Sequence, residues 1–167
     1  MTTPTPRRKP ADEKDTARLT AFINEAYAPA EGFLYVGPRI TEDAVREKLS
    51  HGTFLLDLGE DGSIEGCVFV EVVGDSGYFG LLAVAPSRQH RGQGMALALA
   101  AEALIRSRGC RYLTIDVVNH RHELFPFYRK LGFEVAGERS FDDDRLNRPA
   151  HFVIMRKELV PETPTPA

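Results

Sequence analysis

The feature that most constrains the fold is a change of hydrophobic period at Pro86. Before it, apolar runs of strand character are separated by glycine-rich turns, at residues 53–58, 63–73 and 78–85. Such runs predict an antiparallel meander. After it, residues 95–108 repeat at helical spacing, and a further strand follows at 112–118. Because a crossover helix returns the chain in the same direction, the strands on either side of that helix are expected to pair in parallel.

Further elements flank this central part. A first helix is predicted at 16–27, with Asp15 or Thr16 as a candidate N-cap, and a shorter second helix starts after Thr41. The remaining elements follow the central part, as a helix at 123–131 and strands at 133–139 and 151–156. The predicted order is therefore ααβββαβαββ, an α/β (α+β) fold.

The length of 167 residues is that of one domain. We expect this domain to occupy residues 10–160. A Pro/Thr-rich tail is expected at 161–167, because proline removes backbone donors and prevents regular pairing. Residues 1–9 are expected to form either a flexible tail or a short edge strand.

The formal net charge of −3, with both signs mixed along the chain, argues against a nucleic-acid partner, which would require a basic stripe. No apolar run approaches the roughly 18 residues that span a bilayer, and the first residues lack the apolar stretch of a signal peptide. We therefore expect a cytoplasmic protein without a membrane partner, a monomer or a homodimer. Cys67 and Cys110 lie in apolar stretches and are expected to be reduced core residues. The spacing of the histidines indicates no metal site.

The segment 81–95 carries the strongest chemical signal. A buried strand is followed by a basic turn, and Gly92 and Gly94 open a long helix. Glycines let the backbone approach a bulky anion, and the unused N–H groups of a helix N-terminus point at that anion. With Arg88 and Arg91 adding positive charge, the segment predicts a pyrophosphate site. The alternative is that the glycines only permit a tight turn, since their spacing matches neither a Rossmann turn nor a P-loop.

Two motifs resemble those of the GNAT superfamily of N-acyltransferases. The hallmark of that family, Gln/Arg-x-x-Gly-x-Gly/Ala between a strand and a helix, is filled by Gln89, Gly92 and Gly94. A second family element, aromatic-Tyr-x-x-Leu-Gly-Phe, is similar to residues 127–133. Both stand in the family's order, and the resemblance covers nearly all of residues 10–159. It implies the GNAT fold, a mixed, mostly antiparallel central sheet with helices on both faces.

The resemblance also implies acetyl-CoA as cosubstrate and no metal. The pantetheine arm would pair with strand backbone, at Leu82, Ala83 and Val84. The pyrophosphate would be held by Gln89 and by the amides of the turn, which belong to His90, Arg91, Gly92, Gln93, Gly94 and Met95. Tyr128 would lie near the sulfur and protonate the departing thiolate, since a phenol can supply and regain a proton. The alternative for Tyr128 is a tyrosine that only fills space in the core.

Family members often carry a cofactor-binding asparagine after the fifth strand, and Asn119 is the candidate here. The family's usual spacing from this asparagine to the tyrosine is about seven residues, whereas Asn119 and Tyr128 are nine apart. Either the connection is longer in this chain, or Arg121 occupies the expected place. A helix-capping role is the alternative for Asn119.

The residue that removes the acceptor's proton is expected to be Glu71. The histone-modifying relatives keep a carboxylate at the position that is Tyr78 here, and strand pairing through the turn at 74–77 would bring Glu71 close to it. A partly buried carboxylate there could act through a bridging water. The alternative is a glutamate that leaves the sheet at a solvated strand end. Further candidates for the base are His120, His122, Glu123 and His151.

Together these residues predict direct transfer of an acetyl group from acetyl-CoA to a primary amine of a small molecule or peptide, within a ternary complex. The alternative is a non-catalytic acyl-CoA-binding sensor or scaffold, and the presence of Tyr128 favours the enzyme. The amine is expected to contact segment 25–51, because such loops vary within one fold to give different substrates. That segment presents a mixed surface, with Glu25, Tyr27, Glu31, Phe33, Tyr35 and Arg39.

Overall fold

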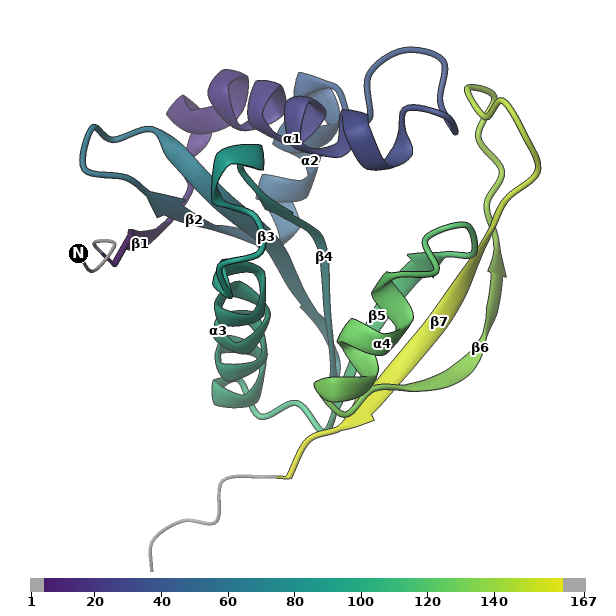
Figure 1. The fold of residues 1–167 in the computed structure, drawn as a ribbon. Helices are drawn as coiled ribbons and strands as arrows, with labels where there is room; N and C mark the ends of the chain where they lie inside the picture. The colour runs from purple at the N-terminus through teal and green to yellow at the C-terminus, as the bar shows by residue number, and fades with distance from the viewer. Residues whose placement is uncertain (1–4, 161–167) are drawn as a thin grey trace, which may run out of the picture.

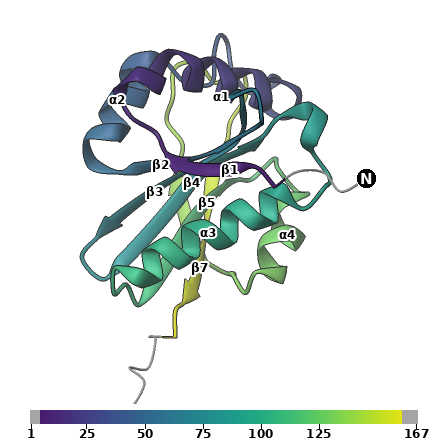
Figure 2. The same cartoon turned by 90° about the vertical axis from the view of Figure 1, so that its left-hand side faces the viewer.

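A computed structural model describes residues 5–160 of the chain. The tail predicted at 161–167 and the first four residues lie outside this range. The described chain forms one mixed sheet of seven strands with helices on both of its faces (Figures 1 and 2). This confirms the fold class that the sequence predicts.

The strands follow the order β1-β2-β3-β4-β5-β7-β6 across the sheet. Their bounds are Arg7–Pro10 (β1), Thr53–Leu58 (β2), Ile64–Val73 (β3), Ser76–Val84 (β4), Tyr112–Val118 (β5), Glu134–Ser140 (β6) and His151–Glu158 (β7). β4 and β5 pair in parallel, as predicted for strands joined by a crossover helix, and the other neighbours pair antiparallel. Of the two possibilities for the N-terminal segment, the structure has the edge strand β1, which pairs with β2.

Edge strand β1 is attached to the sheet by charge as well as by backbone pairing. The guanidinium of Arg8 donates to Asp57 on β2, with Nε 2.7 Å from Oδ1 and Nη2 3.0 Å from Oδ2. Asp57 is fully buried, so its carboxylate requires such a partner. This partner is 49 residues away in sequence, which is why the strand could not be recognised from residues 7–10 alone.

The helices cover the two faces in pairs. Their bounds are Thr16–Glu31 (α1), Glu42–His51 (α2), Gln93–Ser107 (α3) and Leu124–Lys130 (α4). α1 and α2 lie on one face of the sheet, and α3 and α4 on the other (Figure 2). Between each pair and the sheet lies a hydrophobic core, one centred on Leu97, Ile105 and Phe79, the other on Ile23, Phe54 and Phe69.

The helix starts only partly follow the predicted caps. Thr41 caps α2 as predicted, since its Oγ1 accepts from the Ala44 amide. Asp15 occupies the N-cap position of α1, as one of the two predicted alternatives, but its side chain makes no capping hydrogen bond to that helix. Instead, Asp12 forms a capping box with Asp15 around a preceding short 3-10 helix, Glu13–Asp15, and this turn leads directly into α1.

The sheet opens between β4 and β5. Their pairing is limited to residues 76–78 of β4 and 112–114 of β5, and beyond this the two strands diverge (Figure 1). Leu81 has a positive φ of 50°, unusual for a branched residue, and it lies on β4 just past the paired part. From there to Val84, the edge of β4 that faces β5 has no strand beside it. The opening is where a ligand can enter the sheet.

Candidate functional site

The opening between β4 and β5 is occupied by a cavity of about 900 Å³. Its walls come from residues 78–84 of β4 and 115–118 of β5, from the turn at 88–95, from the end of α1 and from the segment that begins α4. Apolar and charged side chains both line it. A cavity of this size and composition is typical of small-molecule and cofactor sites.

At one end of the cavity lies the turn that the sequence predicts to bind pyrophosphate. His90 and Gly92 have positive φ values of 66° and 81°, and Gly92 is the N-cap of α3. The first hydrogen bond of α3 runs from the Ala96 amide to the Gly92 carbonyl (3.0 Å), so the amides of 93–95 are not used within the helix. Such amides are suited to an anion.

The predicted pyrophosphate residues divide into two groups. Those that line the cavity are Gln89, His90, Gly92, Gly94 and Met95. The side chains of Arg91 and Gln93 do not line it, and Nε2 of the Gln93 side chain instead donates to Asp57 Oδ2 at 3.4 Å. Arg88 lines the cavity, but it also pairs with Glu65 at 3.0 Å, so part of its charge is already compensated.

The three β4 residues predicted to pair with pantetheine all line the cavity. Ala83 pairs with Cys67 of β3 on the other side, which fixes the strand. The carbonyl of Leu82 accepts from the Tyr27 hydroxyl at 3.1 Å, and that of Val84 accepts from Nε2 of the Gln89 side chain at 3.1 Å. Each carbonyl has a second lone pair, so these contacts leave acceptor capacity along the edge.

Tyr128 of α4 lines the same cavity and is 7% exposed. Its ring contacts Phe127, Phe133 and Phe79 at centroid distances of 5.0, 5.8 and 6.2 Å. Burial raises the pKa of its phenol well above the ordinary value, while the positive charge of Arg121 opposes the shift. The phenol is therefore protonated at any physiological pH, the state that a proton donor requires.

Arg121, rather than Asn119, is the residue of this loop that lines the cavity. The Asn119 Oδ1 accepts from the His151 amide at 2.9 Å, and Asn119 does not line the cavity. Arg121 does line it, and it lies at the spacing from Tyr128 that the family's asparagine usually has. Of the alternatives that the sequence leaves open, the geometry favours Arg121 as the residue facing the cavity.

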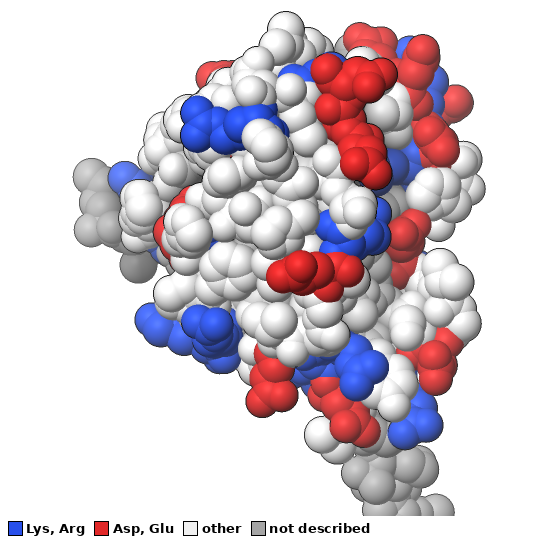
Figure 3. Space-filling view, turned by 90° about the vertical axis from the view of Figure 1, so that its right-hand side faces the viewer, with Lys and Arg blue, Asp and Glu red and all other residues white. Residues whose placement is uncertain are grey.

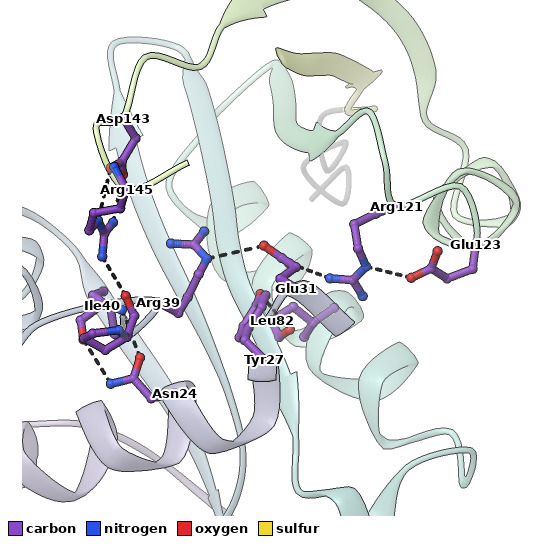
Figure 4. A network of polar contacts seen from close by, with 11 residues as sticks. Asn24, Tyr27, Glu31, Arg39, Ile40, Leu82, Arg121, Glu123, Asp143 and Arg145 are labelled. Atoms are coloured by element: carbon purple, nitrogen blue, oxygen red, sulfur yellow. Dashed lines mark hydrogen bonds and ion pairs between the residues drawn. The ribbon is translucent and has the colours of Figure 1, made fainter. Parts of the chain in front are cut away.

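A buried carboxylate links the wall of α1 to the loop after β5 (Figure 4). Glu31, 4% exposed, accepts from Arg121 Nη1 at 2.5 Å. Arg121 also donates to Glu123 at 2.6 Å. On the other side, Arg39 Nε lies 3.5 Å from Glu31 Oε1 (Figure 4). Glu31 is thus held between two guanidiniums, which compensate its burial.

Glu71 lies opposite Tyr78 in the register of β3 and β4, as the sequence predicts. It is not among the residues that line the cavity, and its Oε2 is 2.9 Å from His51 Nδ1. Tyr78 itself lines the cavity, and burial raises its pKa to about 12. Glu71 therefore lies beside Tyr78 on the neighbouring strand and does not itself line the cavity.

The segment predicted to contact the acceptor contributes Tyr27, Glu31 and Arg39 to the cavity wall. Glu25 faces a separate cavity of about 680 Å³ between α1 and the β2–β3 turn. Three further charged residues line the wall that the sequence did not predict there, and these are Lys48, Asp116 and Arg139. For Asp116 the sequence did offer a signal, because a carboxylate interrupts the apolar run of β5.

The comparisons with known proteins identify the family. The sequence matches the model of the acetyltransferase (GNAT) family over residues 19–133, and the chain belongs to this family. Its members are acetyl-CoA-dependent N-acetyltransferases, so the class of enzyme follows with the family. No curated protein sequence matches the chain.

Solved structures of the same fold agree with this. The chain is similar to the PaiA N-acetyltransferase of Thermoplasma acidophilum in complex with coenzyme A, with 18% identity, a TM-score of 0.74, and 92% of this chain and 98% of that chain covered. It is similar to the ribosomal-protein-S18-alanine N-acetyltransferase of Escherichia coli, with 18% identity, a TM-score of 0.74, and coverage of 95% and 98%. A phosphinothricin acetyltransferase of Sinorhizobium meliloti, in complex with AcCoA, has 16% identity, a TM-score of 0.74, and coverage of 98% and 94%.

Other classes of site receive no support from the described residues. Over residues 5–160, no group of three or more His, Cys, Asp or Glu side chains could hold a metal ion. In the same range, no helix has the length and hydropathy that crossing a bilayer requires. Both cysteines are free and buried, as predicted. On the face shown in Figure 3, acidic and basic side chains are interspersed rather than gathered by sign.

Proposed function

We propose that the protein transfers an acetyl group from acetyl-CoA to a primary amine of a small molecule or peptide, by direct attack within a ternary complex. The observation that carries this proposal is the divergence of β4 from β5, which leaves the β4 edge at 82–84 without a strand beside it. An extended amide-containing arm can pair there as a further strand would. The edge leads straight to the turn that opens α3.

The residues present suit coenzyme A at both ends of the cavity. Gly94 lies at the start of α3, where a Cβ would meet only the Val84 side chain at 3.8 Å, so the backbone is open to a phosphate. The amides of 93–95 and the dipole of α3 favour negative charge there. When bound, acetyl-CoA supplies an activated thioester. The chain's own contribution is to hold it and to manage protons.

Tyr128 is proposed to donate the proton that the leaving thiolate takes up. Its phenol is protonated, lines the cavity, and has no hydrogen-bond partner among residues 5–160. The backbone amide near Val84 is proposed to stabilise the developing oxyanion, since a fixed donor costs no reorganisation. A non-catalytic acyl-CoA sensor would require the cradle but not Tyr128, and the position of Tyr128 supports the enzyme.

Removal of the amine's proton is assigned to Glu71, acting through water beside Tyr78. Glu71 does not line the cavity, so a direct contact with the amine is not part of this proposal. Its partner His51, at 2.9 Å, offers a route by which the proton could leave toward solvent. Asn119 is proposed to be structural, because its side chain fixes the start of β7.

The test is a thiol-release assay with acetyl-CoA and a panel of primary amines, run beside calorimetry of acetyl-CoA binding. We expect micromolar binding of acetyl-CoA and release of CoA that depends on an added amine. Binding of acetyl-CoA without transfer to any amine would instead favour the sensor or scaffold. Absence of binding would remove the proposed cradle altogether.

A further inference from the structure

Arg39 lies in the wall of the cavity with part of its guanidinium unused. Its Nε faces Glu31 at 3.5 Å. Its Cζ is 5.4 Å from the ring centroids of both Tyr27 and Tyr35, so two aromatic rings pack against the guanidinium (Figure 4 shows Tyr27). Among residues 5–160, Nη1 and Nη2 of Arg39 make no hydrogen bond, and the ion pair of this side chain is the one with Glu31. The side chain is 24% exposed and lines the cavity.

A second cation, Lys48 of α2, lines the same part of the cavity. Its Nζ lies 4.8 Å from the centroid of the Phe69 ring, and within the described range it has no ion pair. Burial lowers the pKa of Lys48, Glu71 opposes this, and the charge of Arg39 lowers it further. Two cations thus repel each other across a partly buried space. An anion placed between them would remove this repulsion.

The nearby carboxylates already have other partners. Glu31 accepts from Arg121 at 2.5 Å. Asp143 is held by Arg145 at 2.8 Å, and Glu71 lies 2.9 Å from His51. Glu31 faces Arg39 through Oε1, which makes no hydrogen bond, and none of the three carboxylates makes a hydrogen bond to the Nη edge of Arg39. The anion that fits there must come from a ligand.

The phosphates of coenzyme A belong to the other end of the cavity. The charge of Arg39 lowers the pKa of Tyr78, and that of Lys48 interacts with Glu71, the strand partner of Tyr78. The turn at 88–95, in contrast, follows Val84 at the other end of β4. Tyr78 and Val84 are separated by six residues of extended chain, roughly 20 Å. Lys48 belongs to α2 and Arg39 to the loop before it. α2 lies on one face of the sheet, and the turn leads into α3 on the opposite face (Figure 2). The anion is therefore part of the acceptor.

We propose that the acceptor is a small amine that also carries a carboxylate or phosphonate group, bound by the free edge of Arg39 and by Lys48. This rests on the acetyltransferase function proposed above. A planar guanidinium fork matches both anions in a two-point contact. Tyr27 joins this site to the reacting edge, because its ring lies beside Arg39 and its hydroxyl donates to the Leu82 carbonyl. One side chain thus spans the distance between the anion site and the reacting edge, which suits a small acceptor such as an amino acid.

The experiment measures acetyl transfer to each protein amino acid and to its α-carboxamide, and to 2-aminoethylphosphonate and ethanolamine, at saturating acetyl-CoA. The acid should exceed its amide in kcat/KM by about 10- to 100-fold, the value of a charge-assisted two-point contact. The amine of an amino-acid amide is less basic than that of the free acid and is more often neutral, the form that attacks the thioester. Basicity alone would therefore favour the amide, opposite to the expected result. The phosphonate arm distinguishes the two kinds of anion.

Arg39→Met should remove the preference by raising KM for the acids, with kcat/KM for the amides within about twofold. Arg39→Lys, which keeps the charge without the fork, should restore part of it. Arg46→Met is the matched control, because it removes the same charge from an exposed residue outside the cavity. Arg46 lies on α2 and pairs with Glu42 and Asp43. Should Arg39→Met fail to fold, Lys48→Met tests the same site from the other side.

Calorimetry on the CoA-bound protein gives a readout independent of turnover. The best acid should bind about tenfold or more tightly than its amide, and Arg39→Met should abolish that difference. Equal rates for acids and amides, or an equal loss for both in Arg39→Met, overturns the inference while leaving the acetyltransferase intact. Acetyl-CoA binding without transfer to any amine of either panel contradicts the proposed function, and the inference falls with it.

Discussion

Gly94 offers the sharpest test of the coenzyme A cradle. It is the second residue of α3, and a Cβ built on it would meet only Val84 Cγ2, at an ordinary distance of 3.8 Å. Gly92 is the poorer choice, because its φ of 81° would strain any replacement even though nothing lies within 4 Å. Substitution of Gly94 should therefore leave the fold intact and change only the space in front of the helix.

The expected loss follows from the bonds that a side chain would displace. A phosphate bound to helix amides needs donor–acceptor distances of about 2.7–3.2 Å, which a valine side chain over Gly94 would prevent. Each charge-assisted hydrogen bond contributes about 1.5–3 kcal/mol, so loss of one such bond weakens binding by roughly 10- to 150-fold. Gly94→Ala should show a smaller loss, together with a melting temperature raised by about 1–4 °C through lower backbone entropy of the unfolded chain.

Calorimetry with acetyl-CoA measures the affinity, and thermal unfolding measures the fold. Gly137→Val is the matched control, because a Cβ there meets nothing within 4 Å and the residue lies on edge strand β6. Its affinity for acetyl-CoA should equal that of the wild type. A Gly94→Val protein with both wild-type stability and wild-type affinity would show that the turn does not approach the phosphates.

Three further predictions concern protons. Tyr128→Phe should keep acetyl-CoA binding in calorimetry but lower kcat by about two decades, and unchanged turnover would mark Tyr128 as structural or product release as limiting. Glu71→Gln should lower kcat/KM most at low pH, and a wild-type pH–rate profile on an identified acceptor would rule out its role. Burial alone would raise the pKa of Asp15, but hydrogen bonds from Asp12 and Arg18 leave it below 3.8. Its stabilising effect is thus present above 3.8 and lost as the pH falls through the lowered value, so Asp15→Asn should lower Tm by about 3–6 °C at neutral pH and by little in strong acid.

The elements with a local cause could be predicted from the sequence. The period change at Pro86 gave the parallel pairing of β4 with β5, because a strand, a helix and a strand in succession leave few topologies. Thr41 capped α2 as predicted, since a cap depends only on residues within one turn. The conformation of the glycine turn before α3 belongs to the same kind, since two glycines and a helix start lie within a few residues of each other.

Other parts depend on residues distant in sequence and could not be predicted in this way. Strand β1 has little strand character, and its pairing is supported by the buried charge of Asp57. The cavity wall gathers Lys48 from a helix, Asp116 from β5 and Arg139 from β6, which no local pattern brings together. Asn119 was a reasonable candidate by type, but the length of its loop places Arg121 in the cavity instead.

The loop that carries Arg39 is fixed by hydrogen bonds to another loop, at the end of the sheet where β4 and β5 diverge. Past Tyr78 no ladder joins the two strands, so the walls of the cavity need another connection. Residues 34–38 supply it through contacts with residues 145–147. The Val36 amide donates to the Arg145 carbonyl at 2.8 Å, the Asn147 amide to Leu34 at 2.7 Å, and Arg145 Nη1 to Pro38 at 2.6 Å.

These contacts join the α1–α2 loop to the β6–β7 loop across the open end of the sheet, at the upper right of Figure 1. Arg39 follows the last of them directly, and Asn24 fixes the next residue by two hydrogen bonds with Ile40, of 2.9 and 3.0 Å. A loop held in this way presents its guanidinium at a fixed place, so little side-chain entropy is lost when an anion binds. The contacts that bridge the open end of the sheet therefore also fix the position of Arg39 in the cavity wall, where the anion of the acceptor is proposed to bind.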